Sequence, residues 1–236
     1  MKKLFTDGLS NPKTAKSDRS DRKFLTKILH LAPGNLSGWQ VCSSASAGCL
    51  AACLNTAGRG RMDSVQKARI ARTAFWFNDR EAFKALIIKE LTAFVKRCDK
   101  LESSPAIRMN GTSDLFWEAV FPELFDTFPM VQFYDYTKHV KRCRADYALP
   151  SNYHLTFSRS ESNDAQCLEV LAAGRVNVVA VFDGKEFPKT YWDYPTYSAD
   201  DDDLRFLDPS PKHVGCLYAK GFAKRDETGF VLPVLA

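Results

Sequence analysis

Hydrophobic residues recur with two different periods along the chain, and the change of period marks the expected elements. Short runs rich in β-branched and aromatic residues predict strands, and longer segments with apolar residues every three or four positions predict helices. The predicted strands are 24–31, 106–109, 130–134, 153–157, 176–181, 204–207 and 214–218. Strands that alternate with helices at this spacing predict an α/β fold with a mostly parallel sheet and βαβ crossovers. Both an open doubly wound sheet and a partial (β/α) barrel satisfy the pattern.

Helical periodicity is strongest between residues 63 and 98. A first helix begins at Asp63, and its buried stripe is predicted to be Val65, Ala68, Ala71 and Phe75, with Arg69 off the stripe. A second helix carries a longer apolar stripe from Phe83 to Cys98, which makes Cys98 a small core residue rather than a ligand. Two later segments, 115–125 and 164–173, are also predicted to be helical.

Composition narrows the class of protein. With 236 residues and 45% hydrophobic residues, the chain can bury one sizeable core, predicted to span residues 23–236. Residues 1–22 are polar and rich in Lys and Arg, and they predict a loosely ordered basic arm. No apolar run approaches the roughly 20 residues of a membrane span, and seven cysteines without a signal peptide indicate a reducing cytoplasm and metal use.

Three of the cysteines form a compact motif. Cys42, Cys49 and Cys53 fall within twelve positions, separated by six and three residues that are mostly Ser, Ala, Gly and Leu. If residues 48–54 are helical, Cys49 and Cys53 project from one face, and Cys42 can fold back toward them. Arg59 and Arg61 follow closely and are predicted to offset part of the negative charge of a thiolate site. The alternative is that these are small buried residues of an Ala-rich turn.

The spacing also indicates the kind of metal. Structural zinc usually takes four Cys or His ligands in two close pairs, whereas this chain has a single triplet. An iron–sulfur cluster tolerates wider spacing because its irons spread the sulfur ligands. The motif therefore predicts a [4Fe-4S] cluster on Cys42, Cys49 and Cys53, with one iron open to another ligand. His30 or Cys216 could supply a fourth bond.

Polar clusters follow several predicted strands, at the position where parallel α/β sheets keep their active sites. Asp114, Asp135 and Glu161 are predicted to carry protons or to anchor a substrate amine. Lys138 and Arg159 are predicted to bind a carboxylate or phosphate. Contacts with the cofactor are assigned to Asn110, Ser113, Ser158 and Arg59. Against this interpretation, strands must in any case end in polar turns.

Specific blocks of sequence run from residue 31 onward. They are LAPGNLSG from Leu31, the cysteine segment 42–60, QKARIART from Gln66, RMNGTSD from Arg108, DYTK from Asp135 and LTFSRSE from Leu155. These blocks resemble a bacteriophage family called gene product 88. The resemblance implies a phage-encoded protein made in the host bacterial cytoplasm. In layout the chain also resembles radical S-adenosylmethionine enzymes, although those enzymes typically carry Cys-x3-Cys-x2-Cys.

Two functions follow as hypotheses. The first is an iron–sulfur protein with a radical-SAM-like fold, S-adenosylmethionine as a candidate cofactor and an unknown small molecule or host macromolecule as partner. The second is an accessory factor that binds nucleic acid or a host protein and holds only a structural metal. In that case the basic arm, Arg59, Arg61, Arg69 and Arg72 would contact phosphates. A membrane partner is not expected.

Overall fold

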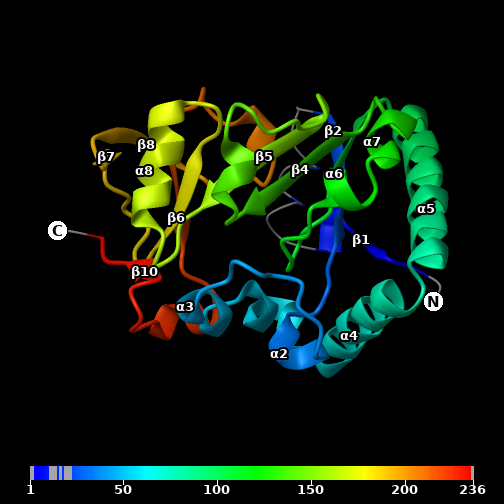
Figure 1. Ribbon diagram of the computed structural model, residues 1–236, viewed down its shortest axis with the longest axis horizontal. Coiled ribbons are helices and arrows are strands. Elements are labelled where there is room, and N and C mark those ends of the chain that lie inside the picture. The colour runs from blue at the N-terminus through cyan, green and yellow to red at the C-terminus, as the bar shows by residue number, and fades with distance from the viewer. Residues whose placement is uncertain (1–2, 11–14, 16–17, 19–22, 235–236) are drawn as a thin grey trace.

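A ten-stranded, mostly parallel β-sheet organises the molecule (Figure 1). The structure is a computed structural model and describes residues 3–10, 15, 18 and 23–234. The strands are β1 (Phe5–Asp7), β2 (Phe24–Leu29), β3 (Ser104–Arg108), β4 (Gln132–Thr137), β5 (Tyr153–Ser158), β6 (Val178–Phe182), β7 (Thr190–Tyr191), β8 (Tyr194–Ser198), β9 (Val214–Tyr218) and β10 (Val231–Leu232). Their order is β1-β2-β3-β4-β5-β6-β9-β8-β7, and β10 pairs with β6.

The parallel strands from β2 to β6 follow one another in chain order, and β9 extends the series. Only the pairs β1–β2 and β7–β8 among the described strands are antiparallel. The expected α/β class, the mostly parallel sheet and the crossovers are therefore confirmed. These pairings do not establish a radical SAM barrel.

Several helices cover one face of the sheet, here called the helix side. The helices are α2 (Gly34–Ser37), α3 (Ala47–Ala51), α4 (Asp63–Asn78), α5 (Arg80–Lys100), α6 (Trp117–Val120), α7 (Glu123–Thr127) and α8 (Asp164–Ala173). Phe83 of α5, Trp117 of α6 and Phe125 of α7 form one core with residues of β2 to β5. A second core places Leu171 of α8 against β6 and β9. Cys98 is fully buried on the α5 stripe, as expected.

The opposite face of the sheet is here called the inner face. Because side chains alternate along a strand, Phe133 on the helix side leaves Tyr134 and Tyr136 on the inner face. Residues 199–208, here called the covering segment, lie across this face. Leu204 and Phe206 of that segment pack on Tyr134 and neighbouring apolar residues. The covering segment includes a 3-10 helix, η5 (Arg205–Leu207), so the strand expected at 204–207 is wrong.

Two predicted helices differ from the structure in instructive ways. The helix expected over 115–125 is two short helices, α6 and α7, with Pro122 between them. Proline lacks the N–H that a continuous helix needs there. In α4 the buried residues are Arg69, Thr73 and Trp76, whereas Ala71 is exposed. The predicted stripe failed because Arg69 and Thr73 are buried by hydrogen bonds, which hydrophobic periodicity does not detect.

Part of the expected basic arm is folded. Phe5–Asp7 form β1, which pairs with β2, and both Leu4 and Phe5 are fully buried. Glu90 of α5 accepts hydrogen bonds from the backbone N–H groups of Leu4 and Phe5, at 2.5 and 3.2 Å. Residues 1–2, 11–14, 16–17 and 19–22 of the arm lie outside the described residues. No helix in the described part of the chain is long and apolar enough to cross a membrane.

Candidate metal centre

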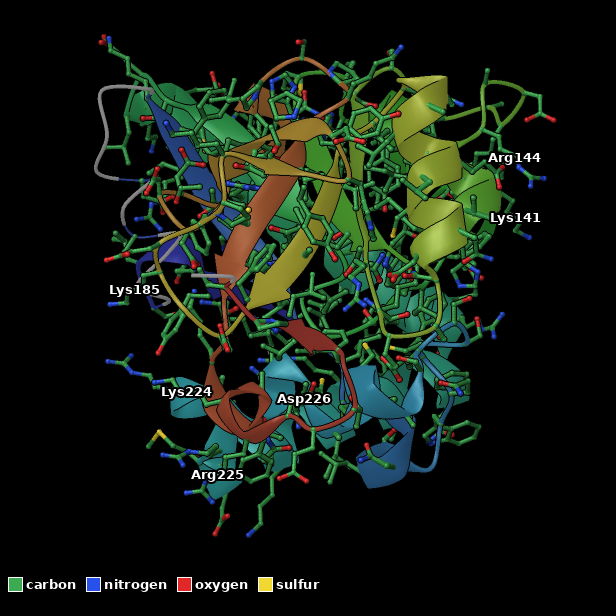
Figure 2. The ribbon with its side chains drawn as sticks, turned by 90° about the vertical axis from the view of Figure 1, so that its left-hand side faces the viewer. Lys141, Arg144, Lys185, Lys224, Arg225 and Asp226 are labelled. Atoms are coloured by element: carbon green, nitrogen blue, oxygen red, sulfur yellow. The ribbon has the colours of Figure 1, made fainter. Side chains whose placement is uncertain are left out.

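The three cysteines lie at the border of the sheet where the parallel strands end, here called the C-terminal rim. The Cys loop (residues 42–61) follows β2 and α2, and Figure 1 shows α2 and α3 beneath the strands, beside the red segment that precedes β10. In Figure 2 strand arrowheads point down toward these helices. Cys42 Sγ donates to the carbonyl of Thr112, beyond β3, at 3.8 Å. The Cys loop and the C-terminal ends of the strands therefore face each other.

The first turn of α3 is held by a residue from the far end of β5. Glu161 accepts hydrogen bonds from Ser46 Oγ and from the N–H of Gly48, both at 2.7 Å. Ser46 in turn caps α3 by accepting from the N–H of Cys49. A Cβ atom at Gly48 would lie 2.2 Å from Thr228 Oγ1 and 2.7 Å from Glu161 Oε2. The small residues of the motif thus allow the Cys loop to pack directly on the C-terminal rim.

Cys49 and Cys53 do not share a helix, which corrects the expected pair on one helical face. Helix α3 ends at Ala51, and Cys53 caps the start of a separate 3-10 turn, η2 (Leu54–Thr56). Its thiolate would accept from the N–H of Asn55 at 3.5 Å. Asn55 is almost fully buried and accepts a hydrogen bond from Arg69 Nη1 at 2.5 Å. Cys53 is therefore positioned by α4 rather than by α3.

The three thiols lie in one electrostatic neighbourhood. Burial, then Asp114, then Cys53 and Cys49 raise the pKa of the Cys42 thiol to about 12. Burial and Cys49 also raise the pKa of Cys53, while Arg69 and Lys138 lower it. All three side chains are partly exposed. A metal that binds here must displace protons from the thiols.

The positive charges near the thiols are not those expected from the sequence. Arg59 and Arg61 are exposed. Arg69 and Lys138, instead, are the positive charges that lower the pKa of the Cys53 thiol. Of the arginines that the nucleic-acid hypothesis assigns to phosphates, Arg59 and Arg61 are accessible from solvent, whereas Arg69 is buried.

The remaining candidate ligands are separate from this triplet. Cys98, Cys143, Cys167 and Cys216 are buried, and Cys216 packs in the core that α8 forms with β6 and β9. His30 stands just beyond β2, close to Gly111 on the inner face. Within the described residues, no three His, Cys, Asp or Glu side chains are arranged to hold a single metal ion.

Two of the predicted acids share a network on the helix side. Asp114 is 3.2 Å from Arg142 Nη1 and accepts from the backbone N–H of Lys138 at 2.8 Å. Arg142 also binds Glu118 and contacts the Tyr153 hydroxyl, which donates to Asp135 at 2.7 Å. Asp135 is fully buried, and burial raises its pKa to about 7. The network joins Asp114 to Asp135, but Asp135 has no exposed surface toward the cysteines.

Asn110 and Ser113 organise the turn after β3. Asn110 Oδ1 accepts from Ser113 Oγ, the Leu115 N–H and Trp117 Nε1, and its amide donates to Asp135. These contacts occupy the Asn110 side chain within the protein. Both residues therefore shape the turn that carries Asp114.

The other predicted residues divide between the C-terminal rim and the last strand. Lys138 Nζ donates to Ser158 Oγ at 2.6 Å, so these two residues lie together at the ends of β4 and β5. Arg159 is 2.8 Å from Asp164 and donates to the carbonyls of Gly229 and Phe230. Arg159 thus holds the segment before β10, and Glu161 holds the Cys loop.

Sequence reasoning missed His139, which lies between the Cys loop and Asp114. Its ring nitrogens are 3.2 Å from Ser43 Oγ and 2.9 Å from Ser44 Oγ, and Nε2 is 3.9 Å from Asp114. The signal available was its position directly after the block DYTK, at the end of a strand. It was missed because the four histidines form no sequence motif.

The fold and the C-terminal rim define an α/β protein with a cysteine triplet at the ends of parallel strands. The family model described as Gene product 88 matches residues 3–233, so the chain belongs to this family of phage proteins. No curated protein and no solved structure matches the chain.

Proposed function

We propose that this protein binds a [4Fe-4S] cluster through Cys42, Cys49 and Cys53. The proposal is supported by two facts: Cys42, Cys49 and Cys53 are the three partly exposed cysteines, and Cys53 and Cys49 both contribute to the raised pKa of the Cys42 thiol. The other four cysteines are buried. A cysteine-ligated centre is expected to show this distribution, with accessible thiols close together in the sequence and buried, unreactive thiols elsewhere.

The donor set fits a cluster better than a single ion. A mononuclear ion needs donors that converge on one point, whereas a four-iron cluster spreads its sulfur ligands over several Å. Arg69 and Lys138 supply nearby positive charge for the thiolates. When bound, a cluster with three protein ligands would supply an iron open to an exogenous ligand, for electron transfer or Lewis-acid chemistry.

We further propose S-adenosylmethionine as a candidate ligand of the same centre. The support is topological: the Cys loop follows β2, the first of the parallel strands that run in chain order. The Lys138 and Ser158 pair at the rim would bind and orient a small polar molecule.

The test is anaerobic purification followed by measurement of iron and sulfide. We expect a brown protein with about four irons and four sulfides per chain and broad sulfide-to-iron absorption. Replacing Cys42, Cys49 or Cys53 by Ala should abolish the colour. The matched controls Cys98→Ala and Cys216→Ala should retain it, because both side chains are buried in core packing. A colourless wild-type protein with one zinc per chain would contradict the cluster.

The S-adenosylmethionine proposal has its own readout. Electron paramagnetic resonance of the reduced protein should change when S-adenosylmethionine is added. A brown protein whose spectrum is unaffected would retain the cluster and reject this ligand.

A further inference from the structure

Unpartnered polar atoms gather on the inner face of the sheet and at its C-terminal rim. Among the described residues, buried side-chain nitrogens or oxygens without a hydrogen-bond partner occur on His30, Arg69, Arg108, Tyr136, His154, Thr156 and Arg205. A buried polar atom without a partner is costly, and native proteins keep few of them. Several such atoms in one region leave hydrogen-bonding capacity that a bound polar ligand would use.

Strand register places most of these side chains on the same face. Ile28 is opposite Arg108, so His30, two positions later and just beyond β2, lies on the face that carries Arg108. Tyr136 is opposite Thr156 in the next pair of strands. The Arg108 guanidinium lies 4.6 Å from the centre of the Tyr136 ring. The donors are therefore neighbours on β2 to β5, at and just below the C-terminal rim.

The unpartnered atoms can all donate hydrogen bonds. Arg69 and Arg108 are more than nine-tenths buried, and each has an Nε without a partner. The other unpartnered atoms are the hydroxyls of Tyr136 and Thr156, ring nitrogens of His30 and His154, and guanidinium nitrogens of Arg205. Guanidinium and hydroxyl donors together are the groups that bind carboxylate or phosphate oxygens.

The charge around His30 is predominantly positive. Burial first, and then Arg69, Arg108 and Arg72, lower the pKa of His30 well below its usual value, and Asp203 opposes them. One carboxylate, Asp203, lies 3.4 Å from Arg108 Nη1 and leaves Arg108 Nε unpartnered. Positive charge in excess at a buried site favours an anionic ligand over a neutral one.

We propose that the inner face, between the Cys loop and the covering segment, binds a small organic anion through Arg108, Arg69 and His30. The ligand class is a molecule with a carboxylate or a phosphate group, and Tyr136 and Thr156 bind its oxygens. This inference deepens the proposed function, since it places the ligand at the rim that carries the cysteines. A reaction of the bound anion would depend on the proposed cluster. Binding of the anion does not depend on it.

The experiment measures binding of inorganic phosphate and of acetate to the full chain, by calorimetry and thermal unfolding, with chloride at matched ionic strength as reference. At least one of the two anions should bind and raise the unfolding temperature. Tyr136→Phe and Thr156→Val should each weaken that binding by about tenfold or more, the usual effect of losing a hydrogen bond to a charged group. Without the anion, both variants should unfold at the same or a higher temperature, because each removes an unpartnered hydroxyl.

Matched variants separate this site from general attraction to positive charge. Arg108→Gln should abolish binding, whereas Arg225→Gln should bind like the wild type, because Arg225 is exposed on η6 (Gly221–Arg225), as Figure 2 shows. Equal loss in Arg225→Gln, or no effect of either anion on the wild type, would overturn the proposal. Iron content is measured in parallel. Anion binding without iron would reject the cluster alone, and iron without anion binding would reject the anion site alone.

Discussion

At the scale of single residues, burial shifts the pKa of Asp135, Cys42 and Cys53 more strongly than their neighbours do. Asp135 accepts hydrogen bonds from the Asn110 N–H and the Tyr153 hydroxyl, yet burial raises its pKa to about 7. Burial raises the pKa of the Cys42 and Cys53 thiols in the same way. Desolvation disfavours the charged form in both cases.

The Asp135 shift predicts a pH dependence of stability. Between its ordinary pKa of 3.8 and about 7, the folded protein holds a proton that the unfolded chain releases. The contribution of Asp135 is therefore fully present below pH 3.8 and is lost as the pH rises through 7. Relative to Asp135→Asn, which cannot ionise, the wild type should lose roughly 4 kcal/mol at most over this range.

Urea unfolding at several pH values tests this expectation. The exposed change Asp126→Asn is the control and should follow the wild type at every pH. A constant difference between wild type and Asp135→Asn from pH 4 to pH 8 would show that Asp135 is ionised in the folded protein.

At the scale of elements, the Cys loop is positioned by contacts from distant segments. Helix α3 has five residues, too few for stability on its own, and Glu161 binds its first turn from beyond β5. Asn55, Gln66 and Arg69 join η2 to α4. The motif can therefore present its thiols only after the sheet and α4 have assembled.

Weakening the Glu161 contact should loosen the proposed metal centre without unfolding the protein. Glu161→Gln has one acceptor oxygen in place of two, so it should cost about 1 kcal/mol of stability and make iron dissociate faster to a chelator. The measurement is the rate of iron transfer to the chelator.

The control for this variant is Glu169→Gln, which removes an exposed ion pair with Arg144. It should release iron at the wild-type rate. Equal rates for Glu161→Gln and the wild type would mean that Glu161 does not hold the loop.

At the scale of the whole molecule, the sheet begins earlier in the chain than the polarity of the N-terminal segment indicates. Strand β1 pairs with β2, and Glu90 of α5 binds the backbone beside it. This end of the chain is part of the cooperative fold.

Phe5→Ala should therefore destabilise the entire protein. Loss of a fully buried aromatic side chain costs about 3–5 kcal/mol, whereas Leu9→Ala at an exposed site should stay within about 0.5 kcal/mol. Urea unfolding measures both. A cost for Phe5→Ala as small as that for Leu9→Ala would show that β1 does not stabilise the fold.

Local patterns in the sequence determined the fold class, most strands of the parallel series and the burial of Cys98. These features depend on periodicity over a few residues. The match to Gene product 88 follows from the sequence as well.

Only the tertiary structure decided which distant polar groups meet. Arg69 is buried because Asn55 accepts its hydrogen bond, and Glu161 reaches Ser46 across 115 positions of the chain. The same holds for Arg108 and Tyr136 on the inner face, whose neighbourhood depends on strand order and register. Hydrophobic periodicity reports burial of apolar side chains, but a buried charge is fixed by a partner that local sequence does not reveal.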